Sequence, residues 1–112
     1  MKIGLKYKGK KILINAKECR GAAMGRGLMF RFKKNAPALV FSFSSPTTLA
    51  LTSLFVFFPF LVLWLDDKNK IIAKKRVSPF KFMINQKEKF SRIIEIPINY
   101  KYKEIIELLD DD

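Results

Sequence analysis

The sequence predicts a small, mainly β domain, and three observations support this fold class. Apolar residues alternate with lysines from Lys2 to Lys8, the two-residue period of a half-buried strand. The interval from Asn35 to Leu65 contains no Asp, Glu, Lys or Arg, although the chain carries 22 basic and 10 acidic residues. The second half of that interval is rich in aromatic and β-branched residues, which favour strands.

The chain is predicted to open with a β-hairpin. Ile3, Leu5 and Tyr7 share one face of the first strand, while lysines occupy the other. The pair Gly9-Lys10 is predicted to form the turn, and the segment from Lys11 to Ala16 the second strand. A short helix is expected from Glu18 to Arg31, although each of its glycines costs about 1 kcal/mol relative to alanine.

Further strands are predicted along the rest of the chain. The segment from Ala38 to Phe43 places Leu39, Phe41 and Phe43 on one face, and the polar run from Ser44 to Thr48 reads as a loop. The remaining expected elements are strands at 49–58, 60–65, 70–77 and 92–96, a turn at 67–69, and a C-terminal helix at 102–109.

The uncharged interval is either the centre of a folded core or a membrane span. A helix from Leu49 to Leu65 would be only about 25 Å long, against a hydrocarbon core near 30 Å. Pro59 would kink such a helix. Strands covered on both faces read as continuous apolar runs. The core interpretation is therefore favoured for a single domain spanning residues 1–112, and membrane association through residues 49–65 is the weaker alternative.

The residue types present give little support for catalysis. The chain contains no histidine, which excludes Ser/His and Cys/His nucleophile pairs and every histidine-based metal site. Cys19 is the only cysteine, so no intramolecular disulfide and no cysteine cluster for zinc can form. We expect no metal and no cofactor. The N-terminus lacks the continuous apolar segment of a signal peptide, and a cytoplasmic, soluble protein is expected.

Positive charge is concentrated near the N-terminus. Residues 1–34 carry eleven lysines and arginines against Glu18 alone, within a net charge of +12. One interpretation is a solvated surface that keeps strand edges soluble. The other is contact with phosphate groups of nucleic acid through the hairpin. The residues that would make such contacts are Lys2, Lys6, Lys8, Lys10 and Lys11.

Five segments together resemble a prokaryotic family, the domain of unknown function 192. They appear in the family's order from about Ala16 to Pro97, and they are the box Gly27-Leu28-Met29-Phe30-Arg31, the strand Leu39-Val40-Phe41-Ser42-Phe43, the aromatic run Phe55-Val56-Phe57-Phe58-Pro59, the strand end Leu63-Trp64-Leu65-Asp66, and Glu95-Ile96-Pro97. The resemblance implies a jelly-roll-like antiparallel sandwich or barrel whose short helix carries the Gly27 to Arg31 box. It implies no known activity.

The chain departs from that family near Pro59. Members usually carry Asp two residues after this proline, where this chain has Leu61. They often have Trp or His followed by Met upstream, where Thr52 and Ser53 stand here. If the family's polar residues at these positions form a site, this chain has lost part of it.

Arg31, Glu95 and Asp66 are the candidate site residues. An arginine beside an uncharged core needs a carboxylate, because an unpaired buried charge costs several kcal/mol. We expect Arg31 to contact Glu95 or Asp66 and to serve the fold, with an anion-binding arginine as the alternative. Asp66-Asp67 reads as a hairpin turn rather than a metal-ligand pair.

The sequence thus predicts no specific activity. A non-catalytic accessory β domain that binds a small ligand or a protein partner is favoured. Sequence-independent nucleic-acid binding through the hairpin is the alternative.

Overall fold

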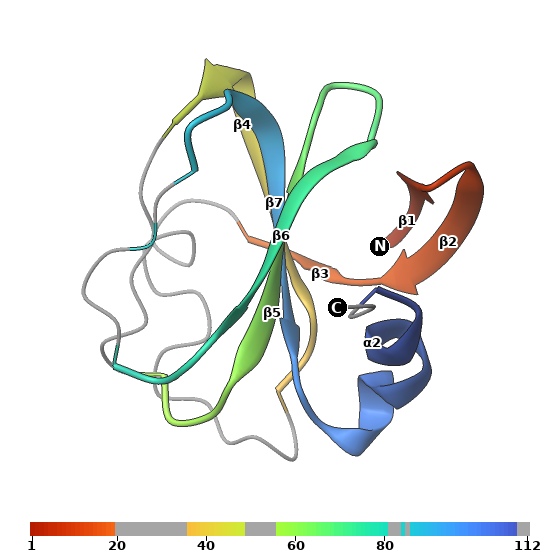
Figure 1. The fold of residues 1–112 in the computed structure, drawn as a ribbon, viewed down its shortest axis with the longest axis vertical. Coiled ribbons are helices and arrows are strands. Elements are labelled where there is room, and N and C mark those ends of the chain that lie inside the picture. The colour runs from red at the N-terminus through yellow and green to blue at the C-terminus, as the bar shows by residue number, and fades with distance from the viewer. Residues whose placement is uncertain (20–35, 49–55, 81–83, 85, 110–112) are drawn as a thin grey trace.

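A computed structural model of the chain describes residues 1–19, 36–48, 56–80, 84 and 86–109. The described part is mainly β, as predicted. Seven strands are followed by a single turn of 3-10 helix and a short α-helix (Figure 1). The elements are β1 (Lys2–Tyr7), β2 (Lys10–Asn15), β3 (Lys17–Glu18), β4 (Leu39–Thr47), β5 (Phe60–Leu65), β6 (Ile71–Val77), β7 (Phe90–Pro97), η1 (Tyr100–Tyr102) and α2 (Lys103–Leu109).

Five of these strands form one sheet in the order β3-β4-β7-β5-β6, and β1 and β2 form a separate hairpin. The short β3 runs parallel to β4, whereas the other neighbours are antiparallel. The last strand in sequence, β7, lies at the centre and pairs with β4 on one side and β5 on the other. The jelly-roll-like arrangement implied by the family resemblance is not confirmed by the described strands.

The N-terminal hairpin is confirmed, with its turn one residue earlier than predicted. Tyr7 pairs with Lys10, so Lys8 and Gly9 form a two-residue loop. Both residues have positive φ, 49° and 76°. That geometry matches the twist of the flanking strands, and glycine adopts it without strain.

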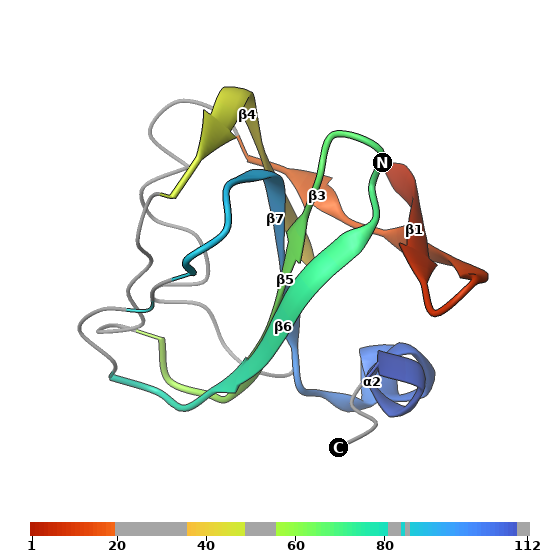
Figure 2. The same cartoon turned by 45° about the horizontal axis from the view of Figure 1, so that its top comes forward.

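The hairpin and α2 lie on the same face of the five-stranded sheet (Figures 1 and 2). Their apolar side chains pack with alternate residues of the sheet in a first core cluster. Its buried members are Ile3, Leu5, Ile14, Ala16, Ala38, Val40, Leu61, Leu63, Leu65, Ile71, Ile94, Ile96, Tyr102, Ile106 and Leu109. The predicted inward face of the first strand is therefore the face that packs on the sheet.

The opposite face of the sheet carries a second core cluster. It contains Cys19, Ala36, Leu39, Phe41, Val56, Phe58, Phe60, Val62, Trp64, Val77, Ile84, Phe90 and Ile93. All six residues of β5 are buried, three in each cluster. This confirms that its uncharged apolar run is core covered on both faces.

Residues 60–65 are a strand, so the weaker alternative, a membrane helix from Leu49 to Leu65, is wrong over that part. No helix within the described ranges is long and apolar enough to cross a membrane.

Several predicted boundaries are wrong. Residues 56–58, the end of the strand predicted at 49–58, are not in a strand, and residues 49–55 lie outside the described residues. Glu18, the expected first residue of a helix, lies in β3, where it pairs with Val40. The predicted loop from Ser44 continues β4 as far as Thr47, which pairs with Phe90 after a shift in register. From Ser42 to Thr47 the chain advances five residues on β4 against two on β7, and this irregularity accommodates Pro46 because it interrupts the hydrogen-bond ladder to which proline cannot donate. The box from Gly27 to Arg31 lies outside the described residues.

The C-terminal helix is confirmed, and two buried polar side chains attach it to the sheet. The hydroxyl oxygen of Tyr102 accepts a 2.7 Å hydrogen bond from the backbone N–H of Ala38. Asn99 Nδ2 donates to the carbonyl of Ala36 at 3.3 Å, and Asn99 Oδ1 accepts from the N–H of Lys101. These bonds fix the position of η1 beside the start of β4.

Replacing Tyr102 with phenylalanine is therefore expected to destabilise the domain by about 1–3 kcal/mol, because the buried N–H of Ala38 loses its acceptor. Urea unfolding followed by circular dichroism measures the change. The matched control is Tyr100→Phe, which removes a hydroxyl from a side chain that is 76% exposed and should change stability by less than about 0.5 kcal/mol. Equal effects of the two substitutions would contradict the role given to the Tyr102 hydroxyl.

Candidate functional site

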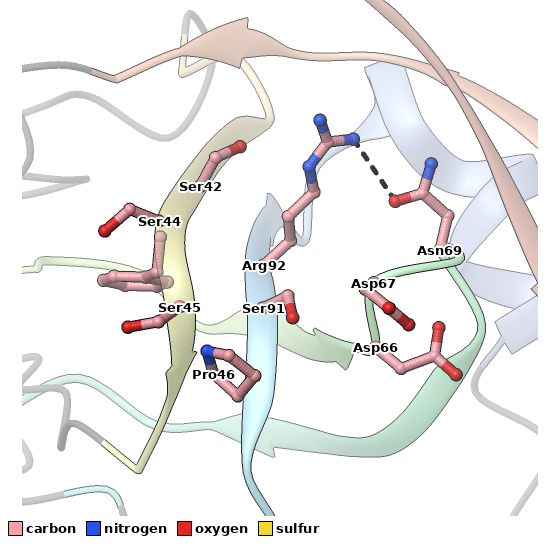
Figure 3. Close-up of a pocket in the computed structure, with 10 residues that line it drawn as sticks. Ser42, Ser44, Ser45, Pro46, Asp66, Asp67, Asn69, Ser91 and Arg92 are labelled. Atoms are coloured by element: carbon pink, nitrogen blue, oxygen red, sulfur yellow. Dashed lines mark hydrogen bonds between the residues drawn. The ribbon is translucent and has the colours of Figure 1, made fainter.

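A polar pocket of about 460 Å³ lies where β4, β7 and the turn between β5 and β6 meet (Figure 3). We call it the serine–arginine pocket. Its lining is Ser42, Phe43, Ser44, Ser45, Pro46, Asp66, Asp67, Asn69, Ser91 and Arg92. The strand β4 supplies one side of the pocket, β7 its middle, and the β5–β6 turn the other side. The pocket therefore depends on the sheet order that places β7 between β4 and β5.

Among the described residues that line the pocket Arg92 is the only cation, and its place follows from strand register. It lies directly across from Ser42 on β4 and from Leu65 on β5. Its Nη1 donates a 3.2 Å hydrogen bond to Asn69 Oδ1, which holds the half-buried side chain toward the β5–β6 turn (Figure 3). A guanidinium carries five N–H donors, so this single bond leaves donors for a ligand.

Asp66 and Asn69 build the turn that faces Arg92. Asp66 Oδ1 accepts hydrogen bonds of 2.9 Å from the backbone N–H groups of both Lys68 and Lys70. Asn69 adopts a positive φ of 64°, which asparagine tolerates better than most residues. These are the turn functions of Asp and Asn. Two carboxylates line this side of the pocket, that of Asp66 and the exposed one of Asp67.

Three serines, Ser42, Ser44 and Ser45, line the β4 side of the pocket, and an aromatic contact anchors this strand. Phe43 packs edge-to-face on Phe90, with ring centroids 5.9 Å apart and an interplanar angle of 70°. Such aromatic contacts are favourable beyond the area they bury. This contact holds the strand against β7 beside the register shift, so the pocket has a fixed wall even though Ser44, Ser45 and Pro46 are exposed.

Glu95 lies elsewhere, in the middle of β7. It pairs with Leu39 on β4 and Val62 on β5, and only 5% of its surface is exposed. Its Oε1 has no hydrogen-bond partner within the part of the chain that the structure describes. Burial raises the pKa of the Glu95 carboxyl from 4.5 to about 8, so at neutral pH the carboxyl is mostly protonated.

The structure does not bring the predicted residues Glu95 and Asp66 together. Val62 is the β5 partner of Glu95, and Asp66 lies four residues further along the chain. At about 3.3 Å per residue this is roughly 13 Å along the sheet. A single arginine could therefore pair closely with only one of them. Arg31 lies outside the described residues, and its pairing stays a prediction.

The five lysines predicted as phosphate contacts are all exposed on the hairpin. Lys6 and Lys11 lie directly opposite each other across the two strands, and Lys2 is on the same outer face. Lys8 and Lys10 flank Gly9 at the turn. The hairpin thus presents a basic surface, as its sequence predicts.

The chemistry available in the serine–arginine pocket suits binding. Its lining offers hydroxyl, amide, carboxylate and guanidinium groups, and the sequence contains no imidazole that could activate a hydroxyl as a nucleophile. No cluster of three or more potential metal ligands occurs among the residues described by the structure.

Comparisons with known proteins establish the fold alone. No protein-family model matches the chain, and no curated protein matches it. A solved structure of a protein of unknown function from Novosphingobium aromaticivorans has a TM-score of 0.77 at 11% identity, covering 99% of this chain and 79% of that one. A candidate transcription regulator from Sinorhizobium meliloti has a TM-score of 0.73 at 16% identity, covering 91% of this chain and 81% of that one.

Proposed function

We propose that this chain is a non-catalytic binding domain whose serine–arginine pocket holds a small polar ligand with an anionic group. The observation that carries the proposal is the Arg92 guanidinium, held by Asn69 in a pocket whose lining includes four serines. Arginine recognises carboxylate and phosphate groups through paired N–H donors. The Asp67 carboxylate on the turn would accept hydrogen bonds from donor groups at the ligand's other end.

The same domain is proposed to belong to the domain of unknown function 192 family and to act in the cytoplasm. The mainly β fold is the class that the family resemblance implies. Cys19 is buried and is the only cysteine, which suits a reducing compartment. The Glu95-Ile96-Pro97 segment of the resemblance ends the central strand β7.

Substitutions at two positions test the proposed pocket. A thermal-shift screen of amino acids, dicarboxylates and sugar phosphates would identify a ligand, and calorimetric titration would measure its affinity. Arg92→Gln is expected to weaken binding by about tenfold or more, because it removes a charge-assisted contact. Asn69→Gly keeps the positive φ of the turn while removing the acceptor that holds Arg92, so it should weaken binding by a smaller factor.

The matched control is Arg76→Gln, which removes an exposed arginine from β6 outside the pocket and should leave affinity unchanged. Each variant is first checked for an unchanged unfolding transition in the absence of ligand. A ligand that binds Arg92→Gln as tightly as it binds the natural chain would disprove this site.

A further inference from the structure

A second pocket lies between the turn of the β1–β2 hairpin and the last turn of α2. Its volume is about 310 Å³, and it is lined by Tyr7, Lys8, Lys10, Lys11, Ile12 and Leu108. We call it the Tyr7 pocket. It shares no residue with the serine–arginine pocket, so an inference about it is independent of the function proposed above.

The floor of the Tyr7 pocket is apolar. Tyr7 and Ile12 are half-buried and pack against the first core cluster, which holds them in place. Leu108, on α2, is 55% exposed although it is a large apolar side chain. An apolar body placed on these three residues would remove apolar surface from water, which is favourable.

Among the described residues of the lining, every charged one is a lysine. Lys8 Nζ lies 5.3 Å from the centre of the Tyr7 ring, and Lys74 Nζ, which also donates to the carbonyl of Leu109, lies 5.4 Å from it. Tyr7 pairs with Lys10, so these two side chains share a face of the hairpin, and positive charge gathers on the side where the pocket lies.

We propose that the Tyr7 pocket binds a small organic anion, with an aromatic or aliphatic body on Tyr7, Ile12 and Leu108 and a phosphate or carboxylate group among the lysines. The concave shape and apolar floor favour such a ligand over a nucleic-acid backbone. Backbone contacts need only positive charge, and the outer-face lysines Lys2 and Lys6 supply that charge without lining the pocket.

The test is a titration of the ¹⁵N-labelled full chain, followed by NMR amide shifts. Three probes separate the parts of the ligand: phenyl phosphate carries body and charge, inorganic phosphate carries charge alone, and benzyl alcohol carries the body alone. Phenyl phosphate is expected to shift amides of residues 7–12 and 108, with an affinity at least about tenfold above that of either other probe.

Two matched pairs of variants localise the site. Lys10→Gln should weaken phenyl phosphate binding by about five- to tenfold, whereas Lys2→Gln removes an equal charge outside the pocket and should have no effect. Leu108→Ser should also weaken binding. Its control is Leu13→Ser, because Leu13 is 62% exposed on the outer face of the hairpin. All four positions lie at the surface, so the fold should be preserved, and the amide spectra report whether it is.

Three results would overturn the proposal. Absence of amide shifts with millimolar phenyl phosphate would show that the pocket binds no such anion. Equal losses of phenyl phosphate affinity in Lys2→Gln and Lys10→Gln would indicate a general electrostatic attraction to the hairpin rather than a pocket. Tighter binding of a single-stranded oligonucleotide, with all hairpin lysines contributing equally, would assign this surface to nucleic acid. Loss of phenyl phosphate binding in Lys10→Gln but not in Arg92→Gln would support a pocket separate from the serine–arginine pocket.

Discussion

Raising the pH from about 5 to about 8 is expected to destabilise the folded domain by roughly 3 kcal/mol through one carboxyl group, that of Glu95. Burial raises the pKa of this group from 4.5 to about 8 in the folded chain. Between these two values the folded state keeps a proton that the unfolded state has lost. The free energy of unfolding therefore falls as the pH rises, and the loss levels off above about pH 8.

The comparison of Glu95→Gln with the natural chain isolates this effect. Glutamine has the same shape and does not ionise, so the variant should lose this part of the pH dependence. It should match the natural chain within about 1 kcal/mol near pH 5 and exceed its stability by roughly 3 kcal/mol near pH 8. Urea unfolding at each pH measures the difference. Glu107→Gln, on the exposed surface of α2, is the control. It should leave the pH dependence of the free energy of unfolding the same as in the natural chain.

The same experiment tests the ion pair that the sequence predicts. If Arg31 contacted the Glu95 carboxylate, the pKa of that carboxyl would lie below 4.5 rather than above it. Glu95→Gln would then be destabilising by roughly 3–5 kcal/mol at neutral pH, because a buried charge on Arg31 would be left without its partner. A loss of stability in Glu95→Gln would thus contradict the neutral carboxyl and support the pair.

Local periodicity predicted the elements whose faces are chemically distinct. The alternation of Ile3, Leu5 and Tyr7 with lysines identifies β1, and the run of buried apolar residues identifies β5. The turn was misplaced by one residue because the sequence Lys8-Gly9-Lys10 fits either position. Only the pairing of Tyr7 with Lys10 decides between them.

The serine–arginine pocket was not predicted because tertiary pairing overrides local composition there. Ser44 to Thr47 has the composition of a loop, yet pairing of Thr47 with Phe90 extends β4 through it. The alternation of residues along 92–96 does, however, single out Arg92 as a candidate site residue. With a period of two, Arg92 shares a face with the buried Ile94 and Ile96, and a charged residue on an apolar face indicates a special role.

The largest expected losses of stability come from truncating side chains on the two faces of β5. Leu63 is fully buried in the first core cluster, and Trp64 is 2% exposed in the second. Each truncation to alanine removes packing and leaves a cavity, so Leu63→Ala should cost about 2–5 kcal/mol and Trp64→Ala about 3–5 kcal/mol. Urea unfolding of the two variants beside the natural chain measures both values, with Leu13→Ala as an exposed control near zero.

The comparison matters because the two side chains point to opposite faces of one strand. A sheet packed on one face and solvated on the other would show a large loss at only one of these adjacent positions. Comparable losses at both positions are expected here, because the hairpin and α2 cover the Leu63 face and the second cluster buries the Trp64 face. A Trp64→Ala variant as stable as the natural chain would show that the second face is not a packed core. The uncharged interval around β5 would then need another explanation.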